Sequence, residues 1–437
     1  MHRWRVRCES TLPTVIRPGN SLLTSLALAF LIGPIQSRAN LSPTSSTDTS
    51  GSAPTIDVVI VGPGDAFYTV FGHTALIVRD SQTQPLSEAK VYNFGVTKLG
   101  DPAFLYRFIM GESVYWGNRR SYAYQLEKWT RNDRTTRRYR LQVSPETARA
   151  IKSDLNRMVA KDNREFIYDL FRVNCVTKVR DLIDDHIGGI MKTRWSHSVD
   201  TETFRKRSES AYSNHPLFYF AFQWVLGRKM DSKPNGYLKS GDPIAFEVRL
   251  KELKDKSGKP VVGAAVYDHR RTGPQPIGNQ VRWYPISLSL ISLLALCLAA
   301  LRRRLPAHFC GALMITSGFL FGLFAAALMY LQVCSQWLEM RQNLLLLMVW
   351  PTDLIICKTG WRILRGKNKP SRFIIGYLKL HLGVSMGLMG LGFIVNDLSG
   401  PILPRLTLTA IWAMVLVLSL IHLQDSKTPT RDIPQNP

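Results

Sequence analysis

The large polar part of this chain has almost no cysteine. Of the six cysteines in 437 residues, only Cys175 lies between residues 51 and 283. A single thiol excludes a disulfide within that segment. The histidines of the segment and Cys175 also lack the spacing of the ligands in a structural zinc site. We therefore expect no metal or diffusible cofactor, and the lone thiol itself needs an explanation: it is either an inert core residue or a reactive group.

Long hydrophobic runs are absent from that segment but fill the C-terminal third. Each run approaches the ~20 residues with which a helix crosses a bilayer, and short charged loops join them. A buried soluble helix would explain one run, but five in succession predict an all-α transmembrane domain of five helices over residues 284–424. The runs are 284–301, 309–331, 342–358, 373–395 and 406–423.

Basic residues near the ends of these runs predict the orientation in the membrane. Three arginines at 302–304 follow the first run, and six lysines and arginines at 358–372 separate the third run from the fourth. Because basic loops stay in the cytoplasm, residues 55–283 are predicted to form an exported domain and residues 425–437 a cytoplasmic tail.

The N-terminus independently indicates export. Residues 1–39 contain a basic stretch, the apolar core LLTSLALAFLIGPI and the cleavage candidate QSRAN, which predict a signal peptide or, if uncleaved, an N-terminal membrane anchor. Residues 40–54 are rich in Ser, Thr and Pro and are predicted to be a linker.

Acidic residues are scarce: 32 Asp and Glu face 56 Lys and Arg, a formal net charge of +24. For an exported domain beside a membrane, this charge favours anionic phospholipid as a partner over nucleic acid. The densest cluster is either a lipid headgroup site or a solvated face. Its members are Arg131, Arg134, Arg137, Arg138 and Arg140.

Cys175 lies where a strand pattern changes to a helix pattern. FIYDLF precedes it, and apolar residues then recur at helical spacing until Gly188 and Gly189 end the pattern. In the first turn of a helix, the dipole and free backbone amides favour a thiolate and stabilise an oxyanion. Asn174 is placed either to cap this helix or to donate a hydrogen bond to an intermediate.

A cysteine nucleophile usually needs a histidine base. His73 opens the alternating strand HTALIVR at the rim of a core, where it can face a helix end, although a structural role is equally open. His186 is excluded because it lies three turns along the helix that Cys175 begins. Three further histidines in loop-like surroundings are weaker candidates: His197, His215 and His269.

The group that would orient His73 is less well defined. Asn93, at the end of a neighbouring strand, is the candidate, with a structural turn role as the alternative. Asp65 in GPGD is predicted to be a turn residue. Within the hydrophobic runs, Asp353 and Lys379 are ionisable and therefore candidates for function, although Lys379 can snorkel to the interface.

The remaining pattern predicts an α+β domain with hairpin-linked strands. The strand that carries His73 precedes the helix that carries Cys175, which is the order of circularly permuted papain-like (NlpC/P60-like) folds. Strands are predicted at 55–62, 71–79, 90–95, 137–143 and 165–171, and helices at 103–110 and 145–160.

These motifs resemble the Lnb-type bacterial lipoprotein N-acyltransferases, which join a periplasmic thiol-enzyme-like domain to a five-helix membrane domain. The resemblance covers most of residues 55–424. It is carried by PGDAFYTVFGHTALIV at 63–78, VYNFG at 91–95, FLYRFIMGESVYW at 104–116 and NCVTKVRDLID at 174–184.

The resemblance implies that Cys175 is the nucleophile, His73 its general base and Asn174 part of the site. It implies an enzyme of the bacterial inner membrane, with its catalytic domain in the periplasm, that moves an acyl chain from phospholipid to the α-amine of a lipoprotein. Family members often have a hydroxyl residue after the cysteine, where this chain has Val176. The alternatives are a membrane-anchored cysteine peptidase or amidase that acts on cell-wall peptides, and a non-enzymatic membrane scaffold.

Overall fold

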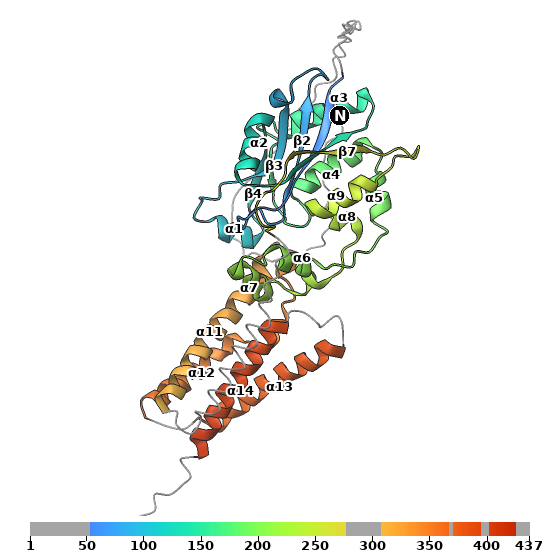
Figure 1. Ribbon diagram of the computed structural model, residues 1–437. Helices are drawn as coiled ribbons and strands as arrows, with labels where there is room; N and C mark the ends of the chain where they lie inside the picture. Colours follow the sequence, from blue (N-terminus) through green and yellow to red (C-terminus); the bar gives the residue numbers. More distant parts are fainter. Residues whose placement is uncertain (1–52, 277–306, 367–369, 395–401, 425–437) are drawn as a thin grey trace, which may run out of the picture. The chain divides into compact units, whose positions relative to one another are not determined.

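The computed structural model describes residues 53–276, 307–366, 370–394 and 402–424. The predicted signal segment, the first hydrophobic run and the C-terminal tail lie outside these ranges. Within them, a seven-stranded sheet is antiparallel throughout and has the order β6-β4-β3-β2-β1-β5-β7 (Figure 1). The strands are β1 (Thr55–Val61), β2 (His73–Arg79), β3 (Lys90–Val96), β4 (Val114–Ser121), β5 (Thr136–Leu141), β6 (Glu165–Ile167) and β7 (Val262–His269).

Strand alternation divides the side chains between two cores. Leu76 and Val78 of β2 share one core with α3 (Pro145–Met158), α4 (Cys175–His186) and α9 (Pro243–Glu252). Ala75 and Ile77 point to the opposite face and pack with Tyr122 and Trp129 of α2 (Tyr122–Arg131). Both faces of the sheet are thus buried, and each fully buried aliphatic side chain contributes ~1.5–3 kcal/mol.

One end of this sheet collects the predicted site. Val61, the last residue of β1, pairs with His73, the first of β2, and continuing the β2–β3 register brings Gly95 opposite His73. Gly95 has φ +127°, which favours glycine, and a Cβ built there would lie 3.8 Å from the Cys175 Cβ. The start of α4 therefore abuts the end of β3, beside His73.

The predicted α+β class is confirmed, with differences in detail. The strand predicted at 165–171 ends at Ile167, because the Asp169 carboxylate accepts the backbone N–H groups of Phe171 and Arg172 and folds the chain into a turn. β4, α2 and β7 were not predicted. Five further helices complete the domain: α1 (Phe104–Met110), α5 (Ile190–Trp195), α6 (Phe204–Ala211), α7 (Pro216–Val225) and α8 (Gly236–Lys239).

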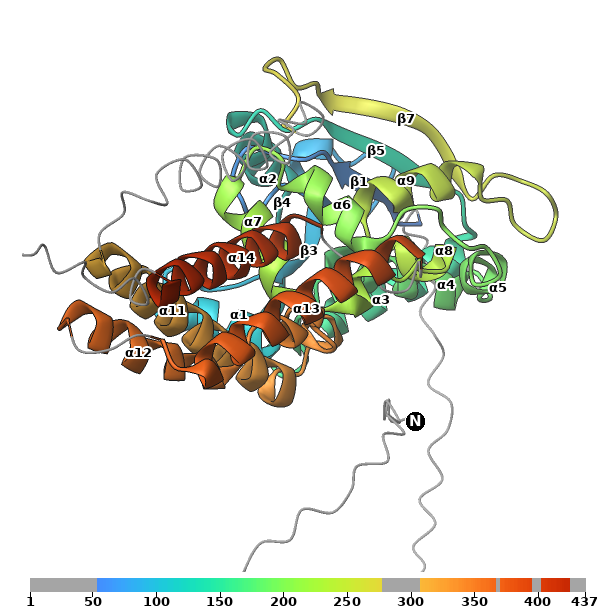
Figure 2. The ribbon, with the colours of Figure 1, turned by 90° about the horizontal axis from the view of Figure 1, so that it is seen from below.

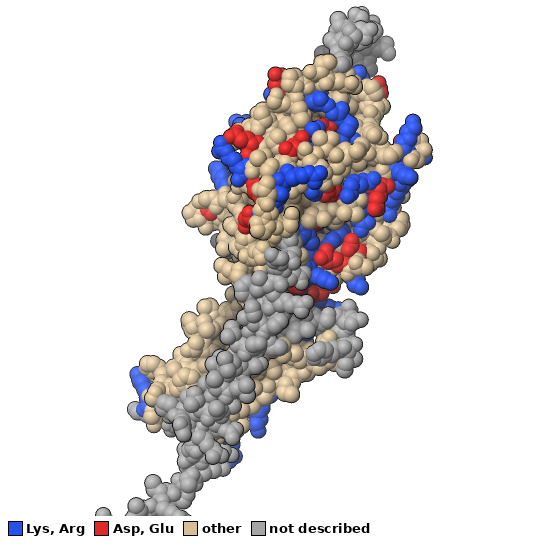
Figure 3. All heavy atoms as spheres, viewed as in Figure 1, with Lys and Arg blue, Asp and Glu red and all other residues tan. Residues whose placement is uncertain are grey.

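Two of the predicted membrane runs form helices long and apolar enough to cross a bilayer, His308–Cys334 and Arg372–Gly392. They lie in α11 (Ala307–Cys334) and α13 (Arg372–Ile394). The run predicted at 406–423 lies in α14 (Ile402–Gln424), whose apolar part, Pro404–Leu420, is shorter. On the face shown in Figure 3, charged side chains are spread over the sheet domain, whereas the visible described surface of the membrane helices is mostly uncharged.

The run predicted at 342–358 is wrong as a continuous helix. Three short 3₁₀ turns lead into α12 (Leu354–Leu364), and the two halves bend by 42°. Pro351 starts the last turn, and the Asp353 carboxylate accepts the Trp350 backbone N–H. Proline lacks an amide donor, so the helix breaks at this point.

Asp353 is fully buried and holds this break together. Its carboxylate lies 2.9 Å from His381 Nε2 and accepts the Tyr377 hydroxyl at 2.6 Å, while His381 Nδ1 lies 3.0 Å from the Met348 carbonyl oxygen. These contacts surround a carboxylate at membrane depth with polar groups. Lys379, the other ionisable candidate, is exposed on the surface of α13.

Candidate active site

Asn174 builds the start of α4. Its Oδ1 accepts the backbone N–H groups of Val176 and Thr177 at 2.9 and 3.0 Å, and the Thr177 hydroxyl accepts the Asn174 N–H at 2.8 Å. Its Nδ2 donates to the carbonyls of Leu170 and Gly241 at 2.8 and 3.0 Å. Of the two roles considered for Asn174, these contacts favour the helix cap.

Asn174→Ala is expected to destabilise the protein by ~2–3 kcal/mol, because the cap is lost and two buried carbonyls lose their donor. The check is the unfolding midpoint of the full chain in detergent. Asn174→Asp should lose less, since it keeps the cap. The matched control is Asn235→Ala, which removes a cap from the short helix α8 and should cost ~1 kcal/mol. Equal losses for both alanine variants would contradict this account.

The Cys175 thiol is half-buried at the helix start. Burial has the largest influence and raises the pKa of the thiol above its ordinary value. The backbone N–H groups of Thr74 and Val176, and the charge of Arg134, act in the opposite direction without overcoming it. The helix start therefore does not by itself produce the thiolate expected from the sequence, and the thiol needs a base.

His73 is held by Asn93. Its Nε2 lies 3.1 Å from Asn93 Oδ1, while Asn93 Nδ2 lies 3.5 Å from Gln125 Oε1. Because an amide oxygen only accepts, this contact places the proton on Nε2 and leaves a lone pair on Nδ1. Burial, followed by the charge of Arg134, lowers the pKa of His73 to about 4, so the imidazole is neutral at pH 7.

The structure brings the backbone of β2, rather than the imidazole, to the thiol. The N–H of Thr74, the residue after His73, acts to lower the pKa of the Cys175 thiol. His73 shares the face of Ala75 and Ile77, whereas α4 packs on the other face. Among the described residues, no hydrogen bond joins the His73 ring to the Cys175 thiol.

The other histidines and Asp65 do not line the cavity, and three of these residues pair with oppositely charged side chains. His186 pairs with Asp154 and His269 with Asp133, both at 3.0 Å, while Asp65 pairs with Arg271 at 2.7 Å. His215 precedes the first residue of α7, and His197 lies between α5 and α6. None of these side chains lines the cavity described below.

The arginine cluster is not a free basic face. Four of its members pair with carboxylates, which supports the structural interpretation over a lipid headgroup site. These pairs are Arg131 with Glu127, Arg137 with Glu247, Arg138 with Asp57 and Asp268, and Arg140 with Asp57. Arg134 differs from all of them, a difference that the sequence does not reveal.

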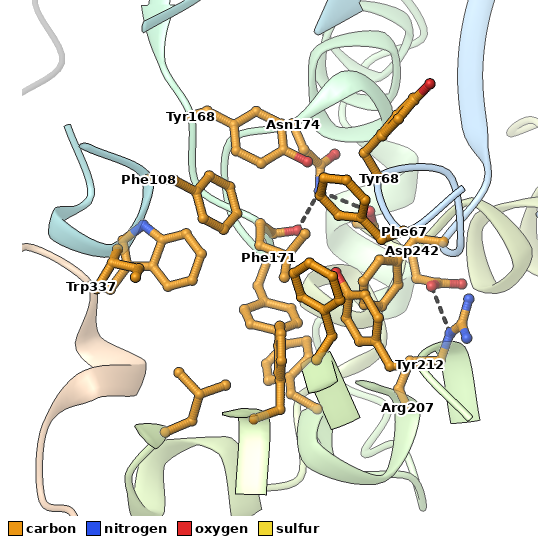
Figure 4. Close-up of a pocket in the computed structure, with 18 of the residues that line it drawn as sticks. Phe67, Tyr68, Phe108, Tyr168, Phe171, Asn174, Arg207, Tyr212, Asp242 and Trp337 are labelled. Carbon is orange, nitrogen blue, oxygen red and sulfur yellow. Dashed lines mark hydrogen bonds and ion pairs between the residues drawn. The ribbon is translucent and has the colours of Figure 1, made fainter. Parts of the chain in front are cut away.

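A cavity of about 560 Å³ has Cys175 and Asn174 in its wall. Aromatic rings from distant parts of the chain converge on it, while an ion pair of Arg207 with Asp242 lies at one side (Figure 4). The rings include Phe67, Tyr68, Phe108, Tyr168, Phe171 and Tyr212. Few polar atoms line the cavity, so it favours an apolar ligand.

The cavity adjoins the membrane helices. Trp337 and Met340, which follow α11, form part of its wall. Helix α1 lies beside α11, and α7 beside α14 (Figure 2). The Met110 carbonyl of α1 accepts the Gln336 N–H at 2.9 Å, and the Trp224 carbonyl of α7 accepts Asn343 Nδ2 at 2.9 Å. Hydrogen bonds thus tie two cavity-lining helices to the segment after α11.

These features define a membrane protein with an α+β domain. At one end of its antiparallel sheet lie the Cys175 thiol and the His73 imidazole, which is hydrogen-bonded to the Asn93 side chain, and the thiol lines an apolar cavity. Residues 46–208 match the family model of the Lnb N-terminal periplasmic domain. The resemblance found in the sequence is confirmed over this part of the chain, which matches the Lnb N-terminal periplasmic domain. The protein is therefore a membrane protein with a periplasmic domain.

No curated protein and no solved structure matches the chain. The permuted papain-like assignment accordingly stays a prediction. The family match ends within α6, so the walls that α7, Trp337 and Met340 contribute to the cavity lie beyond it.

Proposed function

We propose that this protein is an N-acyltransferase of the bacterial inner membrane. It moves an acyl chain from a phospholipid, through a thioester on Cys175, to the α-amine of a lipoprotein. The observation that carries the proposal is the apolar cavity, because Cys175 lies in its wall and the segment after α11 closes another side. Its volume lies within the ~300–1,000 Å³ typical of ligand sites.

The lining favours a hydrocarbon chain over a peptide. Each buried methylene gains ~0.8 kcal/mol, whereas a peptide leaves its N–H and C=O groups unpaired against aromatic rings. This argues against the cell-wall peptidase. The hydrogen bonds that join α1 and α7 to the segment after α11 also connect the cavity wall to α11, which is long and apolar enough to cross a bilayer.

In the first half-reaction, His73 Nδ1 takes the proton of the Cys175 thiol after the imidazole turns toward it. The thiolate attacks the ester carbonyl carbon of the phospholipid and forms a tetrahedral oxyanion, to which the backbone N–H groups of Cys175 and Thr74 donate. The ester C–O bond then breaks, and His73 returns the proton to the oxygen of the leaving lysophospholipid. Cys175 is left as an acyl thioester.

In the second half-reaction, the neutral α-amine of the lipoprotein attacks the thioester carbonyl. His73 accepts a proton from the nitrogen, the C–S bond breaks, and the proton passes to the departing sulfur. The product is an amide, and the thiol and neutral imidazole are restored. Splitting the transfer into two steps lets two bulky lipids use one cavity in turn.

The test is a reconstituted assay of the full chain with an acyl-labelled phospholipid and a diacylated lipopeptide. We expect lysophospholipid and N-acylated lipopeptide from an acceptor with a free α-amine, and no amide from one whose amine is acetylated. Release of peptide from purified cell-wall fragments, without acyl transfer, would establish the peptidase instead.

A bulky side chain at the cavity should block long acyl chains selectively. Ala221 of α7 lines the cavity, and Ala221→Trp is expected to slow transfer from a long-chain donor by ~10–100-fold. Acylation of Cys175 by a four-carbon ester should change far less. The matched control is Ala150→Trp on the exposed side of α3, which should leave both rates unchanged. Equal slowing of both donors by Ala221→Trp would show that the cavity does not hold the chain.

A further inference from the structure

Arg134 is the one member of the arginine cluster that forms no ion pair within the described part of the chain. Its side chain is buried, with 7 % of the residue exposed. Nε donates to the Gly62 carbonyl at 2.9 Å, while Nη2 is buried without a hydrogen-bond partner among the described residues. An unpaired buried charge costs several kcal/mol, so its retention calls for a role.

Two acidic residues near Arg134 have other partners: Asp133 precedes it in the chain, and Asp65 follows Gly64, where a built Cβ would lie 3.1 Å from the Arg134 Cδ. Asp133 accepts the Gly273 N–H at 2.7 Å and lies 3.0 Å from His269 Nε2. Asp65 binds Arg271 at 2.7 Å. The 269–273 segment thus binds both of these carboxylates.

The side chain of Arg134 runs across the end of the sheet where the site lies. Its acceptor, Gly62, follows the last residue of β1, and that residue pairs with His73. On the other side of β2, a Cβ built at Gly95 of β3 would lie 3.8 Å from the Cys175 Cβ. The arginine charge lowers the pKa of His73 and opposes the rise in the pKa of Cys175 that burial causes.

We propose that Arg134 supplies the positive charge that stabilises the Cys175 thiolate when His73 withdraws its proton. This role holds for any thiol chemistry at Cys175, while its use in acyl transfer rests on the proposed function. The same charge destabilises the imidazolium, which makes protonated His73 a strong acid toward the leaving lysophospholipid oxygen. Arg134 thereby favours both the attacking sulfur and the departure of the leaving group.

Three other ionisable groups near the thiol carry no positive charge at pH 7 and so do not stabilise the thiolate as Arg134 does. Tyr115 and Tyr168 interact with it, but burial raises the pKa of each phenol, so both are neutral near pH 7. His73 is also neutral at that pH. A change in thiol reactivity on removing Arg134 therefore reports the arginine charge.

The experiment measures the rate at which iodoacetamide alkylates Cys175 as a function of pH, followed on the Cys175 peptide by mass spectrometry in the full-length protein. Arg134→Met is expected to move the alkylation midpoint up by ~1 pH unit and to slow alkylation at pH 7 by ~10-fold. Arg134→Lys keeps the charge and should stay within ~3-fold of the wild type. The control Arg131→Met removes an exposed, paired arginine and should change nothing.

An unchanged profile for folded Arg134→Met would overturn the proposal. So would a folded Arg134→Lys variant that reacts ~10-fold more slowly than the wild type, and this second variant decides the matter where the methionine variant does not fold. Alkylation requires no acyl donor, so a shifted profile in a protein that transfers no acyl chain would refute the transferase while leaving the role of Arg134 intact.

Discussion

Replacing Cys175 by alanine is expected to lower acyl transfer by at least ~10³-fold, because both half-reactions pass through this sulfur. No other cysteine among the described residues lines the cavity. The direct measurement is mass spectrometry of the Cys175 peptide after incubation with phospholipid. We expect a hydroxylamine-sensitive acyl adduct on the wild-type thiol and none on the variant.

Cys334→Ala provides the matched control. This thiol is exposed at the end of α11, toward the segment that closes the cavity, and its loss should leave adduct and transfer unchanged. A Cys175→Ala variant that transfers acyl chains normally would exclude the thioester mechanism. If neither the wild type nor Cys175→Ala transfers acyl chains, and the variant keeps full function in the cell, the result would favour the non-enzymatic membrane scaffold.

The sequence predicted those parts of the site that depend on local structure. Asn174 and Cys175 lie where a strand pattern gives way to a helix pattern, and the cap and the helix start follow from residues within one turn. His73 lies at the first position of an alternating strand, where the rim of the core is expected. Local propensity and periodicity were sufficient for both.

The parts that the sequence did not reveal depend on distant partners. In the sequence, Arg134 is indistinguishable from the other arginines of its cluster. Its lack of an ion pair among the described residues becomes apparent only in the folded chain, where Asp133 and Asp65 bind the 269–273 segment instead. The cavity likewise combines Phe67, Phe171 and Trp337, whose proximity no local pattern encodes. The raised pKa of Cys175 had the same cause, since burial by distant residues outweighs the helix start.

Replacing His73 by alanine is expected to slow thioester formation by ~10²–10⁴-fold, the usual contribution of a general base. The pH dependence of the wild type carries more information. Because the pKa of His73 is lowered to about 4, the base is protonated only below that pH. Activity should therefore rise as pH increases through about 4 and reach its plateau below pH 6, rather than near the ordinary histidine value of 6.5.

Asn93 provides the variant that tests this assignment. Asn93→Asp places a carboxylate 3.1 Å from Nε2 in the wild-type geometry, which favours the imidazolium and raises the pKa of His73. The acid limb of the rate profile should then move upward by ~1–2 pH units. Gln125→Leu, which removes only the outer partner of Asn93, is the matched control and should leave the limb within ~0.5 units. An acid limb that stays in place in Asn93→Asp would mean that His73 is not the group that titrates, and the base would have to be sought outside the pair of His73 and Asn93.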